Sequence, residues 1–263
     1  MLNGAFTDEY ASALREEAHR NHAAQMEGRD DSGSFRATML VERGVLWEEA
    51  AIHPWLLTLA EHLLGRGCLM FQSDTIVKKA GQDTHPGLHS DYGASRVAEP
   101  FPDYCVLAVG VWAIDDFLEG HGPTVLKPYS HLERRMVPPG TTQDEAVTLH
   151  IPKGSIAFWH GALWHGSTPR TAPGYRTSLH NAYARNFVRV LERYESIHPD
   201  IIARNPPALS TLCGLDDAFG KSGYDGADFS RLGYATQAGF GASDPPPALE
   251  EVVEASSKGG SRL

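Results

Sequence analysis

Residues 154–167 read GSIAFWHGALWHGS, a run of short apolar stretches separated by glycine and histidine. Similar short runs lie on both sides of it: CLMFQSDTIVKKAG at 68–81, CVLAVGVWAIDDF at 105–117, PTVLKPY at 123–129, VTLHIP at 147–152 and RTSLHNAYARNFV at 176–188. Several short strands in series, without long helices between them, favour an antiparallel sandwich or barrel over strand–helix–strand units. We therefore predict a mainly β core over about 68–190, with a jelly-roll architecture.

Helical patterns precede this core. The segment TDEYASALREEAHRNHAAQ at 7–25 is rich in Ala, Glu and Arg and places Tyr10, Leu14 and Ala18 on one face, which predicts an exposed amphipathic helix. A second helix is predicted from about Leu46 to Leu64, with Gly65 as its C-cap. The flanking helices of the fold are thus expected within 7–65.

The C-terminal part of the sequence carries weaker signals. Residues 191–240 are punctuated by proline and glycine, with a helical pattern only near Pro199–Arg204. Residues 241–263 are rich in Pro, Ser, Glu and Gly and are predicted to form a mobile tail. We expect a single domain over 1–240.

Composition excludes several classes of function. The chain has 263 residues and a formal net charge of −10, so it offers no basic field for nucleic acid. No apolar run is long enough for a membrane span, and the N-terminus lacks a secretory signal pattern. The 3 cysteines are widely spaced and suggest neither a disulfide framework nor a thiolate zinc site, so we expect a cytoplasmic location. Nothing in the sequence indicates an oligomeric state.

A metal site is suggested by His89 and Asp91 in LHSDYG, because residues two apart on an extended segment project from the same face. The run at 154–167 offers two further histidines, His160 and His165. We favour His165, which precedes Gly166 at an apparent strand end. Two imidazoles and one carboxylate form the facial triad of non-haem Fe(II) sites. A lone H-x-D is common by chance, however, and most histidines are structural, so the wider pattern must support this reading.

Arg176 lies 11 residues beyond His165, at the start of another predicted strand. A buried guanidinium is costly unless it meets an anion, and its planar fork can pair both oxygens of a carboxylate. Arg176 is therefore a candidate for binding the distal carboxylate of 2-oxoglutarate. An isolated arginine at a strand start is otherwise more often a surface or ion-paired residue.

These motifs together resemble the phytanoyl-CoA dioxygenase family over roughly residues 37–189. The resemblance rests on HSD at 89–91, WAIDDF at 112–117, GHGPT at 120–124, PYSH at 128–131, the run at 154–167 and Arg176. It implies a double-stranded β-helix (a cupin-like jelly roll), Fe(II), 2-oxoglutarate and O2 as cofactors, and hydroxylation coupled to decarboxylation of the co-substrate. It also implies that His89, Asp91 and His165 bind the metal and that Arg176 binds 2-oxoglutarate.

By the same resemblance, Ser167, Trp112 and Gln72 become candidate co-substrate contacts. Ser167 has a hydroxyl suited to a carboxylate, Trp112 could equally be a core aromatic residue, and Gln72 precedes the site on a predicted strand. Related halogenases replace the carboxylate ligand by a small residue so that chloride can bind, so Asp91 favours oxidation of the substrate. The family often has different residues where this chain has His121 and Gly122, which lie in a predicted turn.

The predicted partner is a small-molecule substrate. The segment YGASRVAEPFPDY at 92–104 follows the ligands directly and is a candidate lid or substrate wall. No basic cluster for coenzyme A phosphates is evident, which favours a free metabolite. Two alternatives stay open: a cupin-like metal enzyme that does not use 2-oxoglutarate, and a non-catalytic jelly-roll binding module.

Overall fold

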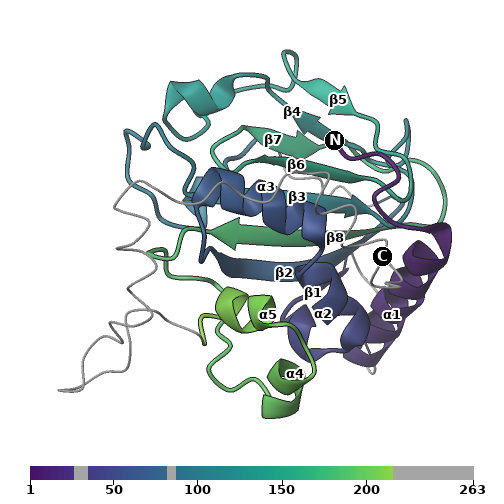
Figure 1. Cartoon of the computed structure of the whole chain (residues 1–263). Coiled ribbons are helices and arrows are strands. Elements are labelled where there is room, and N and C mark those ends of the chain that lie inside the picture. The colour runs from purple at the N-terminus through teal and green to yellow at the C-terminus, as the bar shows by residue number, and fades with distance from the viewer. Residues whose placement is uncertain (27–34, 82–86, 216–263) are drawn as a thin grey trace.

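The computed structural model describes residues 1–26, 35–81 and 87–215, in which two antiparallel sheets stack with helices on one outer face (Figure 1). The first sheet has the order β1-β2-β8-β3-β6, formed by Phe35–Ala37, Leu69–Lys79, Tyr175–Ala184, Leu107–Ala113 and Ile156–His160. The second has the order β5-β4-β7, formed by Val147–Leu149, Thr124–Leu126 and His165–Ser167. The prediction of a mainly β fold with flanking helices is confirmed.

The central strands of the first sheet are buried on both faces. All seven residues of β3 are buried, and side chains at successive positions of a strand point to opposite faces. Leu107, Val109 and Val111 belong to the cluster between the sheets, whereas Ala108 and Trp112 belong to the cluster beneath the helices. The near-continuous apolar sequence of β3 follows from this double coverage.

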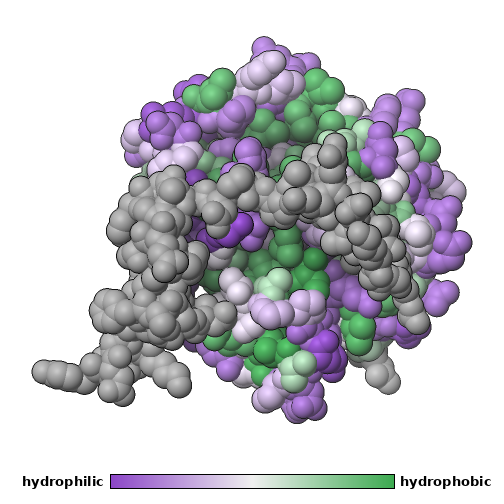
Figure 2. Space-filling view, viewed as in Figure 1, coloured by the Kyte–Doolittle hydropathy of each residue, from purple (hydrophilic) through white to green (hydrophobic). Residues whose placement is uncertain are grey.

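The helices α1 (Asp8–Met26), α2 (Val45–Ala51) and α3 (Pro54–Leu64) cover the outer face of the first sheet, where α3 lies across β3 and β8 (Figure 1). Their apolar residues, among them Leu14, Trp47 and Leu56, pack with Trp112 in one core. The predicted amphipathic face of α1 is confirmed, since Tyr10, Leu14 and Ala18 are all buried. Figure 2 shows hydrophilic surface on the side of α1 and hydrophobic residues toward the centre of this face.

The single helix predicted over 46–64 is in fact two helices. Pro54 stands at the first position of α3, and the ring of a proline disfavours helical geometry at the preceding residue. His53 accordingly has φ −54° and ψ 125°, which separates α2 from α3. The predicted C-cap is confirmed, because Gly65 ends α3 with φ 89°, a conformation that favours glycine.

Several short elements were not predicted. Strand β1 follows a polar segment and has only three residues, and the run at 154–167 divides into β6 and β7, which belong to different sheets. The helical signal near Pro199 corresponds to α4 (Pro199–Ala203), and α5 (Pro207–Leu212) follows it. The tail predicted at 241–263 lies outside the described residues. None of the helices in the described ranges has the length and hydropathy that a membrane crossing requires.

The remaining short elements are three turns of 3-10 helix, at Leu40–Glu42 (η1), Asp91–Gly93 (η2) and Ser130–Glu133 (η3). The second of them bears on the site, because it begins at one of the predicted metal ligands.

Candidate functional site

The side chains of His89, Asp91 and His165 converge at one point between the two sheets. One ligand atom from each residue lies within 4.8 Å of the others, a group that could hold a metal ion. His165 Nε2 is 3.5 Å from Asp91 Oδ2, and His89 Nε2 is 3.9 Å from Asp91 Oδ1. The imidazole rings of the two histidines have their centres 4.3 Å apart. The structure thus brings together the three residues that the sequence selected.

Backbone pairing explains how residues 76 positions apart in the chain meet. His89 N donates to His165 O at 2.8 Å and His165 N donates to His89 O at 2.9 Å, which forms an isolated antiparallel bridge. Asp91 N donates to Gly161 O at 2.9 Å, and the Ser90 side chain caps the turn η2 by accepting from Tyr92 N. The chain therefore turns at Asp91 and does not continue as the extended segment that the sequence suggested.

The histidine rings are oriented as metal ligands usually are. Nδ1 of His89 is 3.0 Å from Gly87 O, and Nδ1 of His165 is 3.0 Å from Leu163 O. A proton on Nδ1 would be held by these carbonyls, which leaves the Nε2 lone pairs facing the centre of the cluster. Burial, followed by the neighbouring His165, lowers the pKa of His89 and favours its neutral form.

Asp91 gives a second indication that the cluster suits a cation. Its Oδ2 atom is buried and has no hydrogen-bond partner among the described residues. A buried carboxylate oxygen without a partner is costly, and a metal ion at the centre of the cluster would remove that cost. Two neutral imidazoles and one carboxylate fit a divalent first-row metal with open coordination positions.

His160, the alternative third ligand in the same run, lies outside this cluster. It ends β6, its Nδ1 accepts from Ala162 N at 3.1 Å, and its ring lies 5.4 Å from that of His131. Burial lowers the pKa of His160 to about 4, so it is neutral near pH 7. The choice of His165 over His160 therefore agrees with the geometry.

The cluster opens into a cavity of about 560 Å³ between the sheets. Its apolar wall is formed by residues from β2, β3, β6 and β8: Phe71, Ile76, Leu107, Val109, Val111, Trp159 and Ala182. Ala94, in the segment 92–104, also lines the cavity, while Tyr92 and Phe101 of that segment are buried in the core between the sheets. The proposed lid segment is thus partly anchored.

Two buried cations line another part of the same cavity. Lys78 on β2 and Arg176 on β8 are cross-strand partners, only 3% and 4% exposed, and neither pairs with a carboxylate among the described residues. Lys78 Nζ donates to Ser167 Oγ at 2.9 Å and to Thr168 O at 2.7 Å. Burial lowers the pKa of Lys78 to about 8 and that of Arg176 to about 9, in each case with a further contribution from neighbouring arginines. Two buried cations beside a hydroxyl form a socket for an anion.

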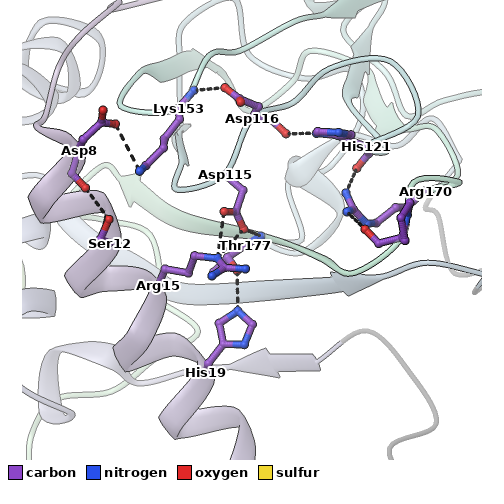
Figure 3. Close-up of polar contacts among 11 residues, drawn as sticks. Asp8, Ser12, Arg15, His19, Asp115, Asp116, His121, Lys153, Arg170 and Thr177 are labelled. Atoms are coloured by element: carbon purple, nitrogen blue, oxygen red, sulfur yellow. Dashed lines mark hydrogen bonds and ion pairs between the residues drawn. The ribbon is translucent and has the colours of Figure 1, made fainter.

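The socket is braced by the turn at 118–122. Arg176 Nη1 donates to Gly122 O, and the guanidinium stacks over the ring of Phe117 at 4.0 Å. Gly122 has φ 72°, a conformation that favours glycine, and a Cβ atom there would lie 3.0 Å from both Lys78 Nζ and Thr168 O, so a side chain would be strained and crowded. Figure 3 shows the outer support of this turn: His121 Nδ1 lies 2.9 Å from Asp116 O, and Arg170 donates to His121 O at 3.4 Å.

The N-terminal helix contacts the same end of the molecule. Arg15 on α1 pairs with Asp115 at 3.0 Å, and His19 Nε2 lies 3.1 Å from Thr177 Oγ1, next to Arg176 in the chain (Figure 3). Asp115 also accepts from Thr177 N at 2.8 Å. These contacts connect α1 to the strand that carries Arg176.

The comparison with known families decides the assignment of the chain. Residues 2–178 match the family described as phytanoyl-CoA dioxygenase (PhyH), a match over more than half of the sequence. The chain belongs to the PhyH family. The family resemblance noted in the sequence is thereby confirmed.

Solved structures similar to this PhyH chain include HygX from Streptomyces hygroscopicus with nickel and 2-oxoglutarate bound, which is 14% identical with a TM-score of 0.61, over 78% of this chain and 88% of that one. The epimerase SnoN, in complex with Fe3+, alpha ketoglutarate and nogalamycin RO, is 18% identical with a TM-score of 0.54, over 72% and 79% of the two chains. The carbocyclase SnoK from nogalamycin biosynthesis is 16% identical with a TM-score of 0.56, over 72% and 80%. These similarities confirm the double-stranded β-helix fold.

Of the three weaker candidates in this PhyH chain, two line the cavity and one does not. Ser167 and Gln72 both border it. Trp112 lies on the opposite face of the first sheet, fully buried, with its ring 4.9 Å from that of Phe6 and 5.0 Å from that of His53. The prediction of Trp112 as a co-substrate contact is corrected by the alternation of β3, which directs Val111 into the cavity and Trp112 toward the helices.

Sequence reasoning missed Lys78 and Asp74, which both line the cavity. Gln72 had been selected, and Asp74, Ile76 and Lys78 follow it at two-residue intervals on the same strand. The period of two along β2 could have placed all four side chains on one face. Polar residues on the inner face of a buried strand were the available signal.

Proposed function

We propose that this protein is an Fe(II)- and 2-oxoglutarate-dependent oxygenase that hydroxylates a C–H bond of a small molecule and releases succinate and CO2. One observation carries the proposal: a single cavity is lined by the three-residue metal cluster and by a buried pair of cations. This combination suits a molecule that binds the metal at one end and carries a carboxylate at the other. PhyH-family membership supports the same conclusion.

The proposed metal ligands are His89 Nε2, His165 Nε2 and the Asp91 carboxylate. They would hold Fe(II) on one face and leave its other positions open to co-substrate and O2. The backbone carbonyls of Gly87 and Leu163 fix the two imidazole rings through Nδ1, so the ligands are oriented before the metal binds. Fe3+ and nickel are the metals named for the similar structures of SnoN and HygX.

The proposed residues for the distal carboxylate of 2-oxoglutarate are Arg176, Lys78 and Ser167. Arg176 is held in place by Gly122 O and still has a buried Nε without a hydrogen-bond partner among the described residues. Lys78 and Ser167 are already hydrogen-bonded to each other, so a carboxylate could accept from both. Gln72 lines the cavity and remains a candidate contact for the co-substrate.

Bound Fe(II), 2-oxoglutarate and O2 would supply the oxidising chemistry, in which decarboxylation of the co-substrate is coupled to oxidation of the substrate. The chain itself positions the reactants and excludes water. Val109, Val111 and Trp159 form an apolar wall beside the cluster, and Trp159 lies 5.1 Å from the ring of His165. Such walls strengthen the interactions of the charged groups and protect the reaction from solvent.

Hydroxylation is the proposed outcome, and the mass of the product tests it. A gain of one oxygen supports hydroxylation, whereas an unchanged mass or a loss of two hydrogens would identify isomerisation, desaturation or ring formation. The similar structures include proteins described as an epimerase and a carbocyclase, so this measurement is needed. A cytoplasmic location remains a prediction, supported by the three buried free cysteines.

Anaerobic titration with Fe(II) and 2-oxoglutarate tests the assignment directly. A keto acid that chelates iron through two oxygens gives a weak visible charge-transfer band, which we expect for the wild type and not for His89→Ala or Asp91→Ala. His62, an exposed histidine of α3, provides the matched control, and His62→Ala should keep the band. A wild-type protein without the band would favour the non-catalytic binding module.

Arg176→Ala separates the proposal from a cupin-like enzyme that does not use 2-oxoglutarate. We expect this variant to lose 2-oxoglutarate binding while keeping the metal. If Arg176→Ala kept the turnover of the wild type and the wild type released no succinate, the co-substrate assignment would be wrong.

A further inference from the structure

Asp74 and Arg36 form an ion pair in the wall of the cavity. This pair belongs neither to the metal cluster nor to the anion socket of Lys78, Arg176 and Ser167. Arg36 comes from the edge strand β1 and Asp74 from β2, and Arg36 Nε donates to Asp74 Oδ2. Both residues line the cavity. The Asp74 side chain is only 2% exposed, whereas that of Arg36 is 52% exposed.

Asp74 has unused capacity to accept hydrogen bonds. An ionised carboxylate offers about four acceptor positions, yet within the described ranges Arg36 Nε supplies the one hydrogen bond to this side chain. Burial raises the pKa of Asp74 to about 6, although Arg36 opposes the rise. A buried carboxylate that faces a cavity and remains partly unsatisfied is suited to accept a hydrogen bond from a ligand.

Arg36 offers the complementary donors. Its Nε is engaged by Asp74, and its two Nη groups donate to no residue in the part of the chain that the structure describes. A guanidinium carries five N–H donors in a fixed plane, so donors remain beside the free positions of Asp74. The pair therefore presents an acceptor and donors side by side, which matches a group that both donates and accepts, such as an alcohol.

The pair and the metal cluster share one cavity, because Arg36 and Asp74 line it together with His89, Asp91 and His165. The charge of Asp91 contributes to the raised pKa of Asp74, and the charge of Arg36 contributes to the lowered pKa of His89. Across the sheet, Asp74 is the direct register partner of His180, which is kept neutral because burial lowers its pKa well below the usual value. A group held by Asp74 would thus be within the same cavity as the metal.

The charges that line the cavity also constrain the substrate. Arg176 and Lys78 are assigned to the co-substrate carboxylate, Asp91 to the metal, and Arg36 and Asp74 neutralise each other. Among the described lining residues no further charged side chain then remains to select a charged substrate. Apart from Gln72, Thr124 and His180, the rest of the wall is largely apolar, with Phe71, Val109 and Trp159 among its residues. A largely apolar wall with a few polar anchors is typical of sites that orient a neutral ligand.

We propose that Asp74 and Arg36 bind a hydroxyl group of a neutral substrate whose body is largely apolar. The substrate hydroxyl donates to Asp74 and accepts from an Nη group of Arg36, which orients the rest of the molecule toward the metal. This proposal rests on the proposed function, because it assigns Arg176 and Lys78 to the co-substrate. Asp74 and Arg36 are then specificity-determining residues.

A binding panel tests the proposal without turnover. The probes are alicyclic alcohols of two or three fused rings, each compared with the hydrocarbon, carboxylic acid and amine of the same skeleton. Binding to the anaerobic protein loaded with Fe(II) and 2-oxoglutarate is measured by ligand-observed NMR. We expect the alcohols to bind and each matched analogue to bind about 10-fold more weakly or worse, since a hydrogen bond to a charged group is lost or a charge is left unpaired.

Variants distinguish substrate recognition from a purely structural ion pair. Asp74→Asn keeps the shape of the side chain, and we expect it to weaken alcohol binding by about 10-fold while the Kd for 2-oxoglutarate stays unchanged. Arg36→Gln, at the more exposed partner, should also reduce the preference for alcohol over hydrocarbon. A structural pair would lower the melting temperature of both variants and leave that preference as it is in the wild type.

The outcomes are separable from failure of the proposed function. Absence of any binder among the alcohols, tighter binding of the acids or amines, or an unchanged preference in both variants would overturn the substrate assignment. Alcohol binding to a wild-type protein that does not bind 2-oxoglutarate would instead overturn the proposed function, and with it the premise of this inference.

Discussion

Lys78 on β2 and Arg176 on β8 are direct cross-strand partners, and both side chains enter the cavity that also contains His165. The placement is unusual because like charges on paired positions repel each other, and burial increases the cost. Burial lowers the pKa of both side chains; Arg176 and Arg170 lower that of Lys78 further, and Arg170 lowers that of Arg176. Such an arrangement is expected where an anion binds and compensates the buried positive charge.

Lys78→Met should weaken 2-oxoglutarate binding by about 10-fold or more, because a charge-assisted hydrogen bond to the co-substrate is lost. The Kd is measured by anaerobic titration of the Fe(II) protein. Lys79→Met is the matched control, since Lys79 is the next residue of β2 and does not line the cavity. Equal affinity in Lys78→Met and Lys79→Met would show that Lys78 does not contact the co-substrate.

Binding of 2-oxoglutarate should also depend on pH near the pKa of Lys78. Burial lowers that pKa to about 8, so in the free protein Lys78 is charged at pH 7 and loses its proton as the pH rises through 8. The charged groups that act on Lys78, Arg176 and Arg170, are both cations, and its hydrogen-bond partner Ser167 is neutral. The Kd should therefore increase between pH 7 and 8.5.

Lys78→Arg provides the control for this pH dependence, because a guanidinium holds its charge to higher pH. We expect its Kd to vary less than that of the wild type over the same range. A wild-type Kd that is constant from pH 7 to 8.5 would argue against a titrating Lys78 in the socket.

Trp112→Phe should destabilise the protein without affecting the site. Trp112 is fully buried and packs against Phe6, Tyr10 and His53, on the face of the sheet that the helices cover. The smaller ring leaves a gap, so we expect the free energy of unfolding in urea to fall by about 1 to 3 kcal/mol. The Kd for 2-oxoglutarate should stay within twofold of the wild type, and a large increase would restore Trp112 as a co-substrate contact.

Much of the fold could be predicted because burial leaves a pattern in the sequence. The long strands β2, β3 and β8 are apolar or alternating, and α1 shows a helical period in Tyr10, Leu14 and Ala18. Strand β1 has three residues and no period of its own, and it forms because β2 offers a free edge. The division of 154–167 into two strands depends on pairing with β3 and β4, which no local pattern encodes.

The site was predictable to the extent that its chemistry is local. His89 and Asp91 are two residues apart in the sequence, and His165 and Arg176 could be related to them through the family resemblance. To predict Lys78 and Asp74, one would need to know which face of β2 meets the second sheet, and tertiary packing determines that face. The same missing information left the side of β3 occupied by Trp112 undecided.

Gly161→Ala should weaken metal binding although Gly161 is not a ligand. Gly161 O accepts from Asp91 N at 2.9 Å and from Ser90 Oγ at 3.1 Å, and thereby holds the turn that presents Asp91. A Cβ atom at this position would lie 2.6 Å from Leu107 O and equally close to Leu107 Cδ2. Backbone atoms cannot yield as a flexible side chain can, so the segment must shift, at a cost of about 1 to 3 kcal/mol.

That shift moves the carbonyl that Asp91 and Ser90 depend on, and the Asp91 carboxylate with it. We expect the affinity for Fe(II) to fall by about 10-fold, measured by anaerobic competition with a chelator, because ligand geometry supported by surrounding hydrogen bonds is disturbed. Ala162→Gly, at the next position, leaves the Gly161 carbonyl in place and should bind Fe(II) nearly as well as the wild type. Equal affinity in Gly161→Ala and Ala162→Gly would mean that the hydrogen bonds from Asp91 and Ser90 do not determine how the metal ligands are held.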